Sequence, residues 1–193
     1  TEVTKDITLY AKWTKIEKEQ PWSKASDWAI EELDKANELN LIPEIFNEQD
    51  LTVNLTRKEF VHIAVKLYEK ITGTKAIAIA NNPFTDTEDA EVLKAYNIGI
   101  TNGTSDTTFA PDALITREQM ATMMTRALTK AGIDTTVNLD KVKKFADDDQ
   151  MHDWGKASIY YMSNIEIIKG MGDGTFGVLG NATREQSLLI STT

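Results

Sequence analysis

The chain has 193 residues, 41% of them hydrophobic, enough to bury one good core or one core with an appendage. Its formal net charge of −9 argues against sequence-independent nucleic-acid binding, so any anionic ligand needs locally placed cations. Without cysteine there are no disulfides or thiolate metal sites, and no apolar run is long enough to predict membrane insertion. The sequence opens in the middle of a pattern, as a fragment would, so a missing signal peptide says little about export.

The first predicted element is a short β-strand within residues 3–14, because apolar and polar residues alternate there. One face of this strand carries Ile7, Leu9, Ala11 and Trp13. It is either an edge strand of the main domain or the closing strand of a preceding β module. We assign residues 1–16 to the remnant of such a module and the charged residues 17–25 to a linker.

Beyond the linker, three copies of one signal read Thr-Arg-x-Glu/Gln. Threonine followed three residues later by Glu or Gln is a capping box, which predicts a helix start at Thr56/Glu59, Thr116/Gln119 and Thr183/Gln186. Capping does not explain the arginines, because a cation in the first turn faces the positive end of the helix dipole, a penalty of roughly 0.3–1 kcal/mol. We therefore expect Arg57, Arg117 and Arg184 to serve a partner outside their helix, a ligand in preference to an acid of another unit.

Amphipathic periodicity and the repeat place one helix before each of these signals and a second helix after it. A helix from Ser26 closes near Asn40, the helix after Thr56 stops at Gly73, and the one after Thr116 ends near Gly132. The methionine stripe of that last helix is predicted to be core and not a binding face. Its members are Met120, Met123 and Met124.

Internal repeats decide the fold class. A separation of 67 residues recurs in Gly103/Gly170, Phe109/Phe176 and Arg117/Arg184, and Arg57 precedes Arg117 by 60. The chain thus divides into three helix–loop–helix units over residues 26–75, 82–133 and 143–193, which must pack together to bury their apolar stripes. Only nine residues follow Arg184, so the last helix is expected to be short.

This pattern resembles the S-layer homology domain of Gram-positive surface proteins. Unit two carries the motif at Phe84, Asp86, Gly99, Gly103, Phe109, Pro111 and Ile115-Thr116-Arg117. Unit three carries it at Phe145, Asp147, Trp154, Gly170, Asp173-Gly174-Thr175-Phe176 and Thr183-Arg184. Unit one keeps Trp28 and its Thr-Arg signal but lacks the glycines and the Asp-Gly-Thr-Phe turn. Separately, Asp6 to Trp13 resembles the closing strand of Listeria–Bacteroides repeats.

The resemblance implies a mainly α-helical fold, a pseudo-threefold prism of three repeats with grooves between units and a short N-terminal strand. It also implies non-catalytic anchoring of a secreted protein at the extracellular cell wall or S-layer of a Gram-positive bacterium. The implied partner is an anionic, pyruvylated secondary cell-wall polysaccharide, with no cofactor and no nucleic acid. The alternative is a protein–protein or self-association module.

The implied polymer contacts are the arginines of the repeated signal with nearby glycines and tryptophans: Arg57, Arg117, Arg184, Gly103, Gly170, Trp28 and Trp154. From residue chemistry alone, we expect the two glycines to supply backbone geometry first and the two tryptophans to pack first. The degenerate loop of unit one and the short final helix predict one or two working grooves.

Other candidate chemistry is weaker. The acidic run Asp147-Asp148-Asp149 with Asp153 lacks calcium-loop spacing and is predicted to be solvated. The glycines of residues 170–174 follow no strand, so they are not a dinucleotide fingerprint. His62 and His152 have no nucleophile in a recognisable motif nearby, and carboxylates alone do not support a polysaccharide-cleaving enzyme.

Overall fold

The computed structural model describes residues 21–190. The strand predicted within residues 3–14, and with it the assignment of residues 1–16 to an upstream β module, lies outside the described residues. Within them the chain is mainly helical, with one short parallel strand pair, β1 (Trp22–Lys24) beside β2 (Gln49–Asp50). The predicted fold class is confirmed.

Six α-helices occur in the described part of the chain, two in each predicted unit. They are α1 (Ile30–Glu38), α2 (Arg57–Thr72), α3 (Ala90–Ile98), α4 (Arg117–Lys130), α5 (Asp153–Asn164) and α6 (Arg184–Leu189). Two short 3-10 turns, η1 (Glu44–Phe46) and η2 (Asp148–Gln150), lie in units one and three.

All three predicted capping boxes form, at Thr56, Thr116 and Thr183, each with the reciprocal bond from the residue three positions on. They fix the starts of α2, α4 and α6 where the sequence predicts them. The left-handed conformation of Gly73 (φ 66°) ends α2, also as predicted. The short last helix is found as well, since α6 has 6 residues.

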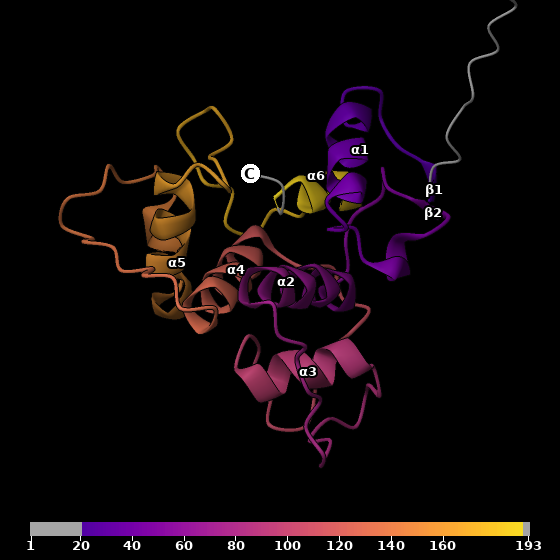
Figure 1. The fold of residues 1–193 in the computed structure, drawn as a ribbon. Helices are drawn as coiled ribbons and strands as arrows, with labels where there is room; N and C mark the ends of the chain where they lie inside the picture. Colours follow the sequence, from indigo (N-terminus) through magenta and orange to yellow (C-terminus); the bar gives the residue numbers. More distant parts are fainter. Residues whose placement is uncertain (1–20, 191–193) are drawn as a thin grey trace, which may run out of the picture.

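The three units surround a common centre (Figure 1), and hydrogen bonds between their loops join them in a ring. The first helices, α1, α3 and α5, lie at the periphery, and the second helices, α2, α4 and α6, meet near the centre. Three equivalent loop residues, Leu55, Ile115 and Ala182, close the ring: the Ile115 amide donates to the Leu55 carbonyl at 3.2 Å and the Leu55 amide to that of Ala182 at 3.0 Å. The Asn181 side-chain amide completes the circuit by donating to the Ile115 carbonyl at 2.7 Å.

One hydrophobic core runs through all three units. The predicted core stripe is confirmed, because Met120, Met123 and Met124 are all buried on α4. Burial of these side chains against the neighbouring units supplies the main stabilising term, at about 25 cal/mol per Å² of apolar surface. None of the helices that the structure describes has the length and apolar character needed to cross a membrane.

Candidate functional site

The junctions between units are built by the first turn of each second helix. Its first amide donates to a carbonyl in the loop of the next unit: Arg57 to Ala113 at 2.9 Å, Arg117 to Gly180 at 2.8 Å and Arg184 to Val53 at 3.0 Å. Such amides have no partner inside their own helix. Each unit therefore caps the helix of the unit before it, and unit one caps that of unit three, so the three junctions form a closed ring.

At two junctions the arginine side chain follows the same path into the next unit. Arg57 Nε donates to the Phe109 carbonyl at 3.0 Å and its guanidinium lies 4.9 Å from the centre of the Phe109 ring. Arg117 makes the same pair of contacts with Phe176, at 2.9 Å and 4.8 Å. Burial lowers the pKa of both guanidiniums. Arginine stays charged even so, and a cation over an aromatic face is favourable when it is desolvated.

Gly103 allows the aromatic stack behind Arg57 to close. The Phe109 ring packs on Phe84 with 5.8 Å between centroids, and a Cβ at Gly103 would stand 2.6 Å from the Phe84 ring. Gly103 also has a φ of 84°, which favours glycine. The prediction that Gly103 supplies backbone geometry is confirmed, because its left-handed conformation and its closeness to the Phe84 ring both require a residue without a Cβ.

Gly170 does the same in unit three. A Cβ at that position would lie 2.8 Å from the Phe145 ring, which packs on Phe176 with 5.6 Å between centroids. The 67-residue repeat therefore reproduces a complete set of contacts: a glycine, two phenylalanines and an arginine from the preceding unit.

The aspartate of each repeated Phe-x-Asp motif holds this turn. Asp147, buried, accepts from the amides of Phe176 and Gly177, both at 2.8 Å. Burial works against its ionisation, but the backbone donors together outweigh this and hold the pKa of Asp147 below its usual range. Asp86 accepts from the Phe109 amide in the same way.

The predicted solvation of the acidic run is therefore wrong for two of its members. Asp147 is the buried clamp just described, and Asp148 accepts from the Tyr160 hydroxyl at 2.8 Å and from Lys156 at 3.1 Å. Their carboxylates already serve protein donors. Among the described residues no group of three or more His, Asp or Glu is placed to hold a metal ion.

Arg184 meets a carboxylate instead of an aromatic ring. Its guanidinium donates to Glu59 Oε1 at 2.6 Å and to the Asp50 carbonyl at 2.9 Å. Both side chains are mostly buried, at 16% and 8% exposed, and Arg184 Nε has no acceptor among the described residues. Unit one, which lacks the Asp-Gly-Thr-Phe turn, thus closes the ring with an ion pair.

The residue after each arginine makes a second contact across the junction. Glu118 accepts from the backbone amide of His152 at 2.8 Å and from its ring Nδ1 at 2.7 Å, at the start of α5. Glu185 accepts from the amide and hydroxyl of Ser26, both at 2.8 Å, ahead of α1. Unit one has Lys58 at this position.

Between units one and two the corresponding junction uses different residues. Asp89 caps its own helix, α3, and His62 of α2 lies 3.0 Å from its carboxylate. His62 and His152 therefore each make a contact between neighbouring units. The sequence alone did not reveal this role.

The two tryptophans predicted to pack are exposed. Trp28 and Trp154, the residues two positions after Ser26 and His152, are 58% and 50% exposed. The packing expectation is wrong because both rings, one just before α1 and one in the first turn of α5, are turned toward solvent. Trp154 stacks on His152, with 5.2 Å between ring centroids. Exposed indole rings are suited to stacking on sugars.

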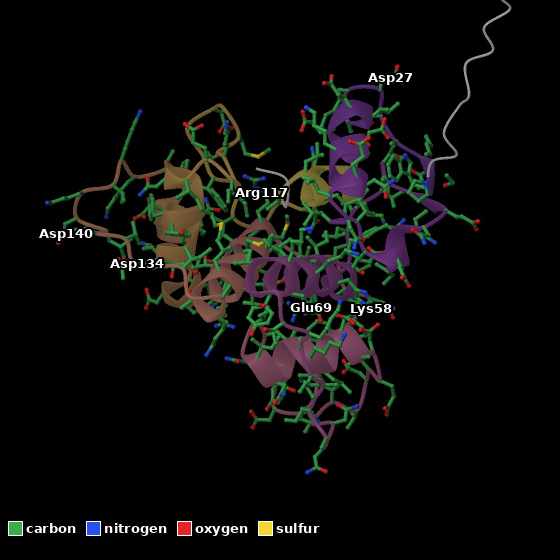
Figure 2. The ribbon with its side chains drawn as sticks, in the orientation of Figure 1. Asp27, Lys58, Glu69, Arg117, Asp134 and Asp140 are labelled. Carbon is green, nitrogen blue, oxygen red and sulfur yellow. The ribbon has the colours of Figure 1, made fainter. Side chains whose placement is uncertain are left out.

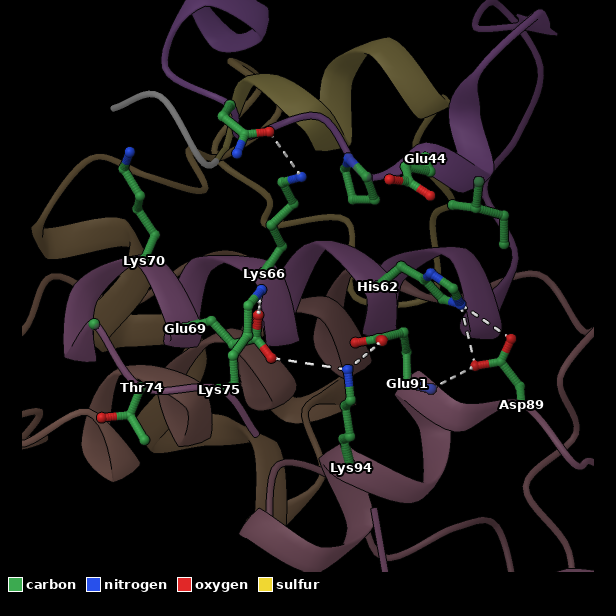
Figure 3. Close-up of a pocket in the computed structure, with 14 residues that line it drawn as sticks. Glu44, His62, Lys66, Glu69, Lys70, Thr74, Lys75, Asp89, Glu91 and Lys94 are labelled. Atoms are coloured by element: carbon green, nitrogen blue, oxygen red, sulfur yellow. Dashed lines mark hydrogen bonds and ion pairs between the residues drawn. The ribbon is translucent and has the colours of Figure 1, made fainter. Parts of the chain in front are cut away.

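A cavity of about 780 Å³ opens between units one and two (Figure 3). We call it groove one; it lies between α2, α3 and the residues that follow α1. Most of its carboxylates are paired within it: Glu69 with Lys75 at 2.5 Å, Glu91 with Lys94 at 2.6 Å, and Asp89 with His62. Its remaining cations are Lys66, which donates to Asn40 at 3.2 Å, and Lys70.

The sequence-predicted residues are distributed over several junctions and are not brought together into one site. Arg57 is buried, at 4% exposed, and Arg117 lies toward the middle of the molecule, where α4 meets unit three (Figure 2). All three arginines have a partner outside their helix, and in each case it lies in the neighbouring unit. For Arg184 it is the acid of another unit that was the less favoured expectation, and binding of a ligand by these arginines stays a prediction.

These features define a class of protein: a helical repeat domain in which three units close into a ring, with a groove between units one and two. Residues 83–121 and 144–186, which lie in units two and three, match the family of the S-layer homology domain. Units two and three therefore belong to that family. The match to both units includes the Thr-Arg signal, the Phe-x-Asp clamp and the glycine behind the aromatic stack.

Relatives carry the same region within much longer proteins. An endoglucanase of Bacillus sp. (strain KSM-635) is 31% identical over 58% of this chain and 12% of its own length. A cell surface protein of Thermoanaerobacter kivui is 34% identical over 50% of this chain and 13% of its own length. An amylopullulanase of Thermoanaerobacterium thermosulfurigenes is 28% identical over 56% of this chain and 6% of its own length.

The matched segment is therefore a small part of these relatives, whose enzyme names belong to the longer proteins. S-layer homology domains are non-catalytic modules of surface proteins that generally anchor to the cell wall and bind its polymers.

Proposed function

We propose that this chain holds a larger exported protein on the wall of a Gram-positive bacterium by binding an anionic secondary cell-wall polysaccharide that carries pyruvyl ketals. The observation that carries the proposal is the membership of units two and three in a wall-anchoring family. A chain with net charge −9 that binds such a polymer must do so through local cations, and groove one supplies Lys66 and Lys70 without a carboxylate partner among the described residues.

The polymer contacts are proposed residue by residue. Trp28 and Trp154 are carried forward because both rings are exposed. Arg117 and Arg184 are partly exposed and can add a contact to the one they make with the next unit. Arg57 is not carried forward, because it is buried and both its Nε and Nη1 atoms already donate within the protein.

Gly103 and Gly170 are assigned to packing, since each accommodates a phenylalanine ring of its own unit. Substituting either would disturb binding only by disturbing the turn. The proposal therefore rests on exposed rings and accessible cations.

The test is co-sedimentation with purified Gram-positive walls, before and after chemical extraction of the secondary polymer. Wild-type protein is expected to sediment with intact walls and to stay in solution with stripped peptidoglycan. Equal binding to stripped walls would overturn the polymer assignment. Trp28→Ala and Trp154→Ala are expected to weaken sedimentation, whereas Ile77→Ala, an apolar truncation at a still more exposed loop position, leaves it unchanged.

A self-association module is the second candidate. The loops that precede the three second helices each expose a large apolar side chain shortly before the helix: Val53, Leu114 and Leu179. Apolar side chains exposed near all three junctions favour contact with a second copy of the chain. Light scattering over a hundredfold range of protein concentration tests it: a constant monomer mass argues against self-association, and a rising mass supports it.

A further inference from the structure

The sequence contains a single Asn-Gly pair, Asn102-Gly103, in the segment between α3 and the turn of unit two. The other ten asparagines precede residues that carry a side chain. Glycine has no Cβ, so the main-chain nitrogen that follows Asn102 is open to close approach by the asparagine side chain. The pair is not part of the repeat, because unit three has Lys169 before its equivalent glycine, Gly170.

The Asn102 side chain is not held in place by the fold. It is exposed, and its amide makes no hydrogen bond with any residue in the part of the chain that the structure describes. Other asparagines are held: Asn97 of α3 donates to the Ile77 carbonyl at 2.9 Å, and Asn181 donates to the Ile115 carbonyl at 2.7 Å. Asn102 therefore combines the most reactive following residue with a side chain that can change its rotamer freely.

A cavity of about 530 Å³ beside α3 gives this side chain room to turn. Asn102 lines it together with Ile79, Tyr96, Asn97 and Asp106. All five residues lie in unit two or in the segment that leads into it. A ring formed between the Asn102 side chain and its own main chain can therefore be accommodated without moving another unit.

The main chain at Gly103, in contrast, leaves little space for displacement. A Cβ at this position would stand 2.6 Å from the Phe84 ring and 2.6 Å from the Thr108 carbonyl oxygen. The Phe84 ring packs on Phe109, and the ring and carbonyl of Phe109 hold Arg57 of unit one at 4.9 Å and 3.0 Å. A change in main-chain length just before Gly103 therefore reaches the junction between units one and two.

We propose that Asn102 is a site of spontaneous deamidation, and that the isoaspartyl product loosens the junction between units one and two. The Gly103 nitrogen attacks Asn102 Cγ and the new N–Cγ bond closes an imide ring. The Cγ–Nδ2 bond breaks, and ammonia leaves with the proton of the Gly103 amide. Water then opens the imide: addition at Cγ gives aspartate, and addition at the main-chain carbonyl carbon gives isoaspartate, which lengthens the main chain by one methylene.

One contact in the folded chain slows this reaction. The Gly103 amide donates to Thr101 Oγ1 at 3.3 Å, a long hydrogen bond that must break before the nitrogen attacks. Deamidation is therefore expected to be slower in the folded chain than in a peptide of the same sequence. The reaction needs only water, so the proposal does not depend on what the chain binds.

The first test incubates the whole chain for several weeks at pH 6 and at pH 8 and follows deamidation by mass spectrometry. Trypsin releases residues 95–117 as one peptide, which contains both Asn97 and Asn102. The mass gain is expected at Asn102, several-fold faster at pH 8 because more of the attacking nitrogen is deprotonated. Methylation by an isoaspartate-specific methyltransferase identifies the product. No gain at Asn102, or an equal gain at Asn97, overturns the site.

The second test compares melting temperatures. The isoaspartyl fraction, separated by chromatography, is expected to melt about 2–4 °C or more below fresh protein, the shift that one weakened contact gives in a domain of this size. Asn102→Asp carries the new charge without the longer main chain, and is expected to melt within about 1 °C of wild type. An isoaspartyl fraction that melts like Asn102→Asp overturns the link to the junction.

Asn102→Gln is the matched control. It keeps an exposed amide before Gly103, but its longer side chain must close a larger imide ring, which forms far more slowly. This variant is expected to gain no mass at residue 102 and to keep its melting temperature throughout the incubation. If it loses melting temperature on the same time course as wild type, the loss arises elsewhere in the chain, and the proposal is overturned.

Discussion

The Arg117 junction and the Arg184 junction have the same main-chain hydrogen bond but different side-chain contacts. In both, the first amide of a second helix donates to a loop carbonyl of the next unit. Arg117 then packs on the Phe176 ring, whereas Arg184 pairs with Glu59. The ring of units is thus set by main-chain contacts, and the arginine accepts either an aromatic face or a carboxylate as its partner.

This difference separates two kinds of stabilisation. A cation over a ring leaves no unpaired charge when the ring is removed, so the loss is limited to about 0.5–2 kcal/mol plus packing. A mostly buried ion pair leaves an uncompensated charge when one partner is removed, which costs about 3–5 kcal/mol. Unit one, whose motif is the most degenerate, therefore closes the ring through the Arg184–Glu59 ion pair, the contact whose loss is expected to cost the most stability.

The largest effect is expected at Glu59. Glu59→Ala removes the partner of Arg184 and the reciprocal bond of the capping box to Thr56, and should lower the free energy of unfolding by about 3–5 kcal/mol. Glu59→Gln keeps an acceptor in place, as Gln119 does for Arg57 at 3.0 Å, and should cost about 1 kcal/mol. Urea unfolding at pH 7 measures both. A cost below about 1 kcal/mol for Glu59→Ala would show that the ion pair does not stabilise this junction.

The next effect is expected at Asp147 and depends on pH. The folded state holds the pKa of this carboxyl below its ordinary value of 3.8. Its contribution is therefore present above that value and lost as pH falls through the folded pKa. Asp147→Asn should lower stability at pH 7 by about 1.5–3 kcal/mol, the worth of hydrogen bonds to a charged group.

The variant should also lose less stability than wild type between pH 5 and pH 2. The matched control is Asp149→Asn, at an exposed position two residues on, which should follow the wild-type curve. Parallel curves for wild type and Asp147→Asn in urea unfolding at several pH values would contradict the clamp.

Removing the aromatic partner of Arg117 ranks third. Phe176→Leu keeps the main-chain acceptor of Arg117 Nε but removes the ring, and should cost about 1–2 kcal/mol. A double-mutant cycle with Arg117→Met isolates the contact and should return a coupling of about 0.5–2 kcal/mol. Zero coupling would mean that the ring and the guanidinium are neighbours without an energetic link.

Local signals predicted the helices and the repeat well. The capping boxes at Thr56, Thr116 and Thr183 form because threonine and the residue three positions later satisfy each other's backbone amides, a contact that depends on nothing distant. The 67-residue repeat predicted which positions are equivalent. It also predicted that the arginines reach outside their helices.

The partners of these arginines could not be read from the sequence. Whether Arg57 meets a polymer or Phe109 depends on how the loop of unit two closes over the first turn of α2, and 52 residues separate the pair. The same holds for Glu118 and His152, which the ring of units brings together.

The smallest effect is expected at Lys58, which occupies the position that is glutamate in units two and three. Glu118 is buried and holds the start of α5 through His152, so Glu118→Gln should cost about 1–2 kcal/mol by weakening a charge-assisted contact. The Lys58 side chain makes a surface pair with Asp112 at 3.4 Å, and Lys58→Gln should change stability by less than about 0.5 kcal/mol. The start of α3 does not depend on Lys58, because Asp89 caps it and His62, another residue of α2, holds Asp89 in place. Urea unfolding at low and high salt separates the two cases: the small effect of Lys58→Gln should vanish at high salt, whereas that of Glu118→Gln should persist because the contact is buried. Equal, salt-insensitive costs for both variants would mean that Lys58 supports its junction as the glutamates support theirs.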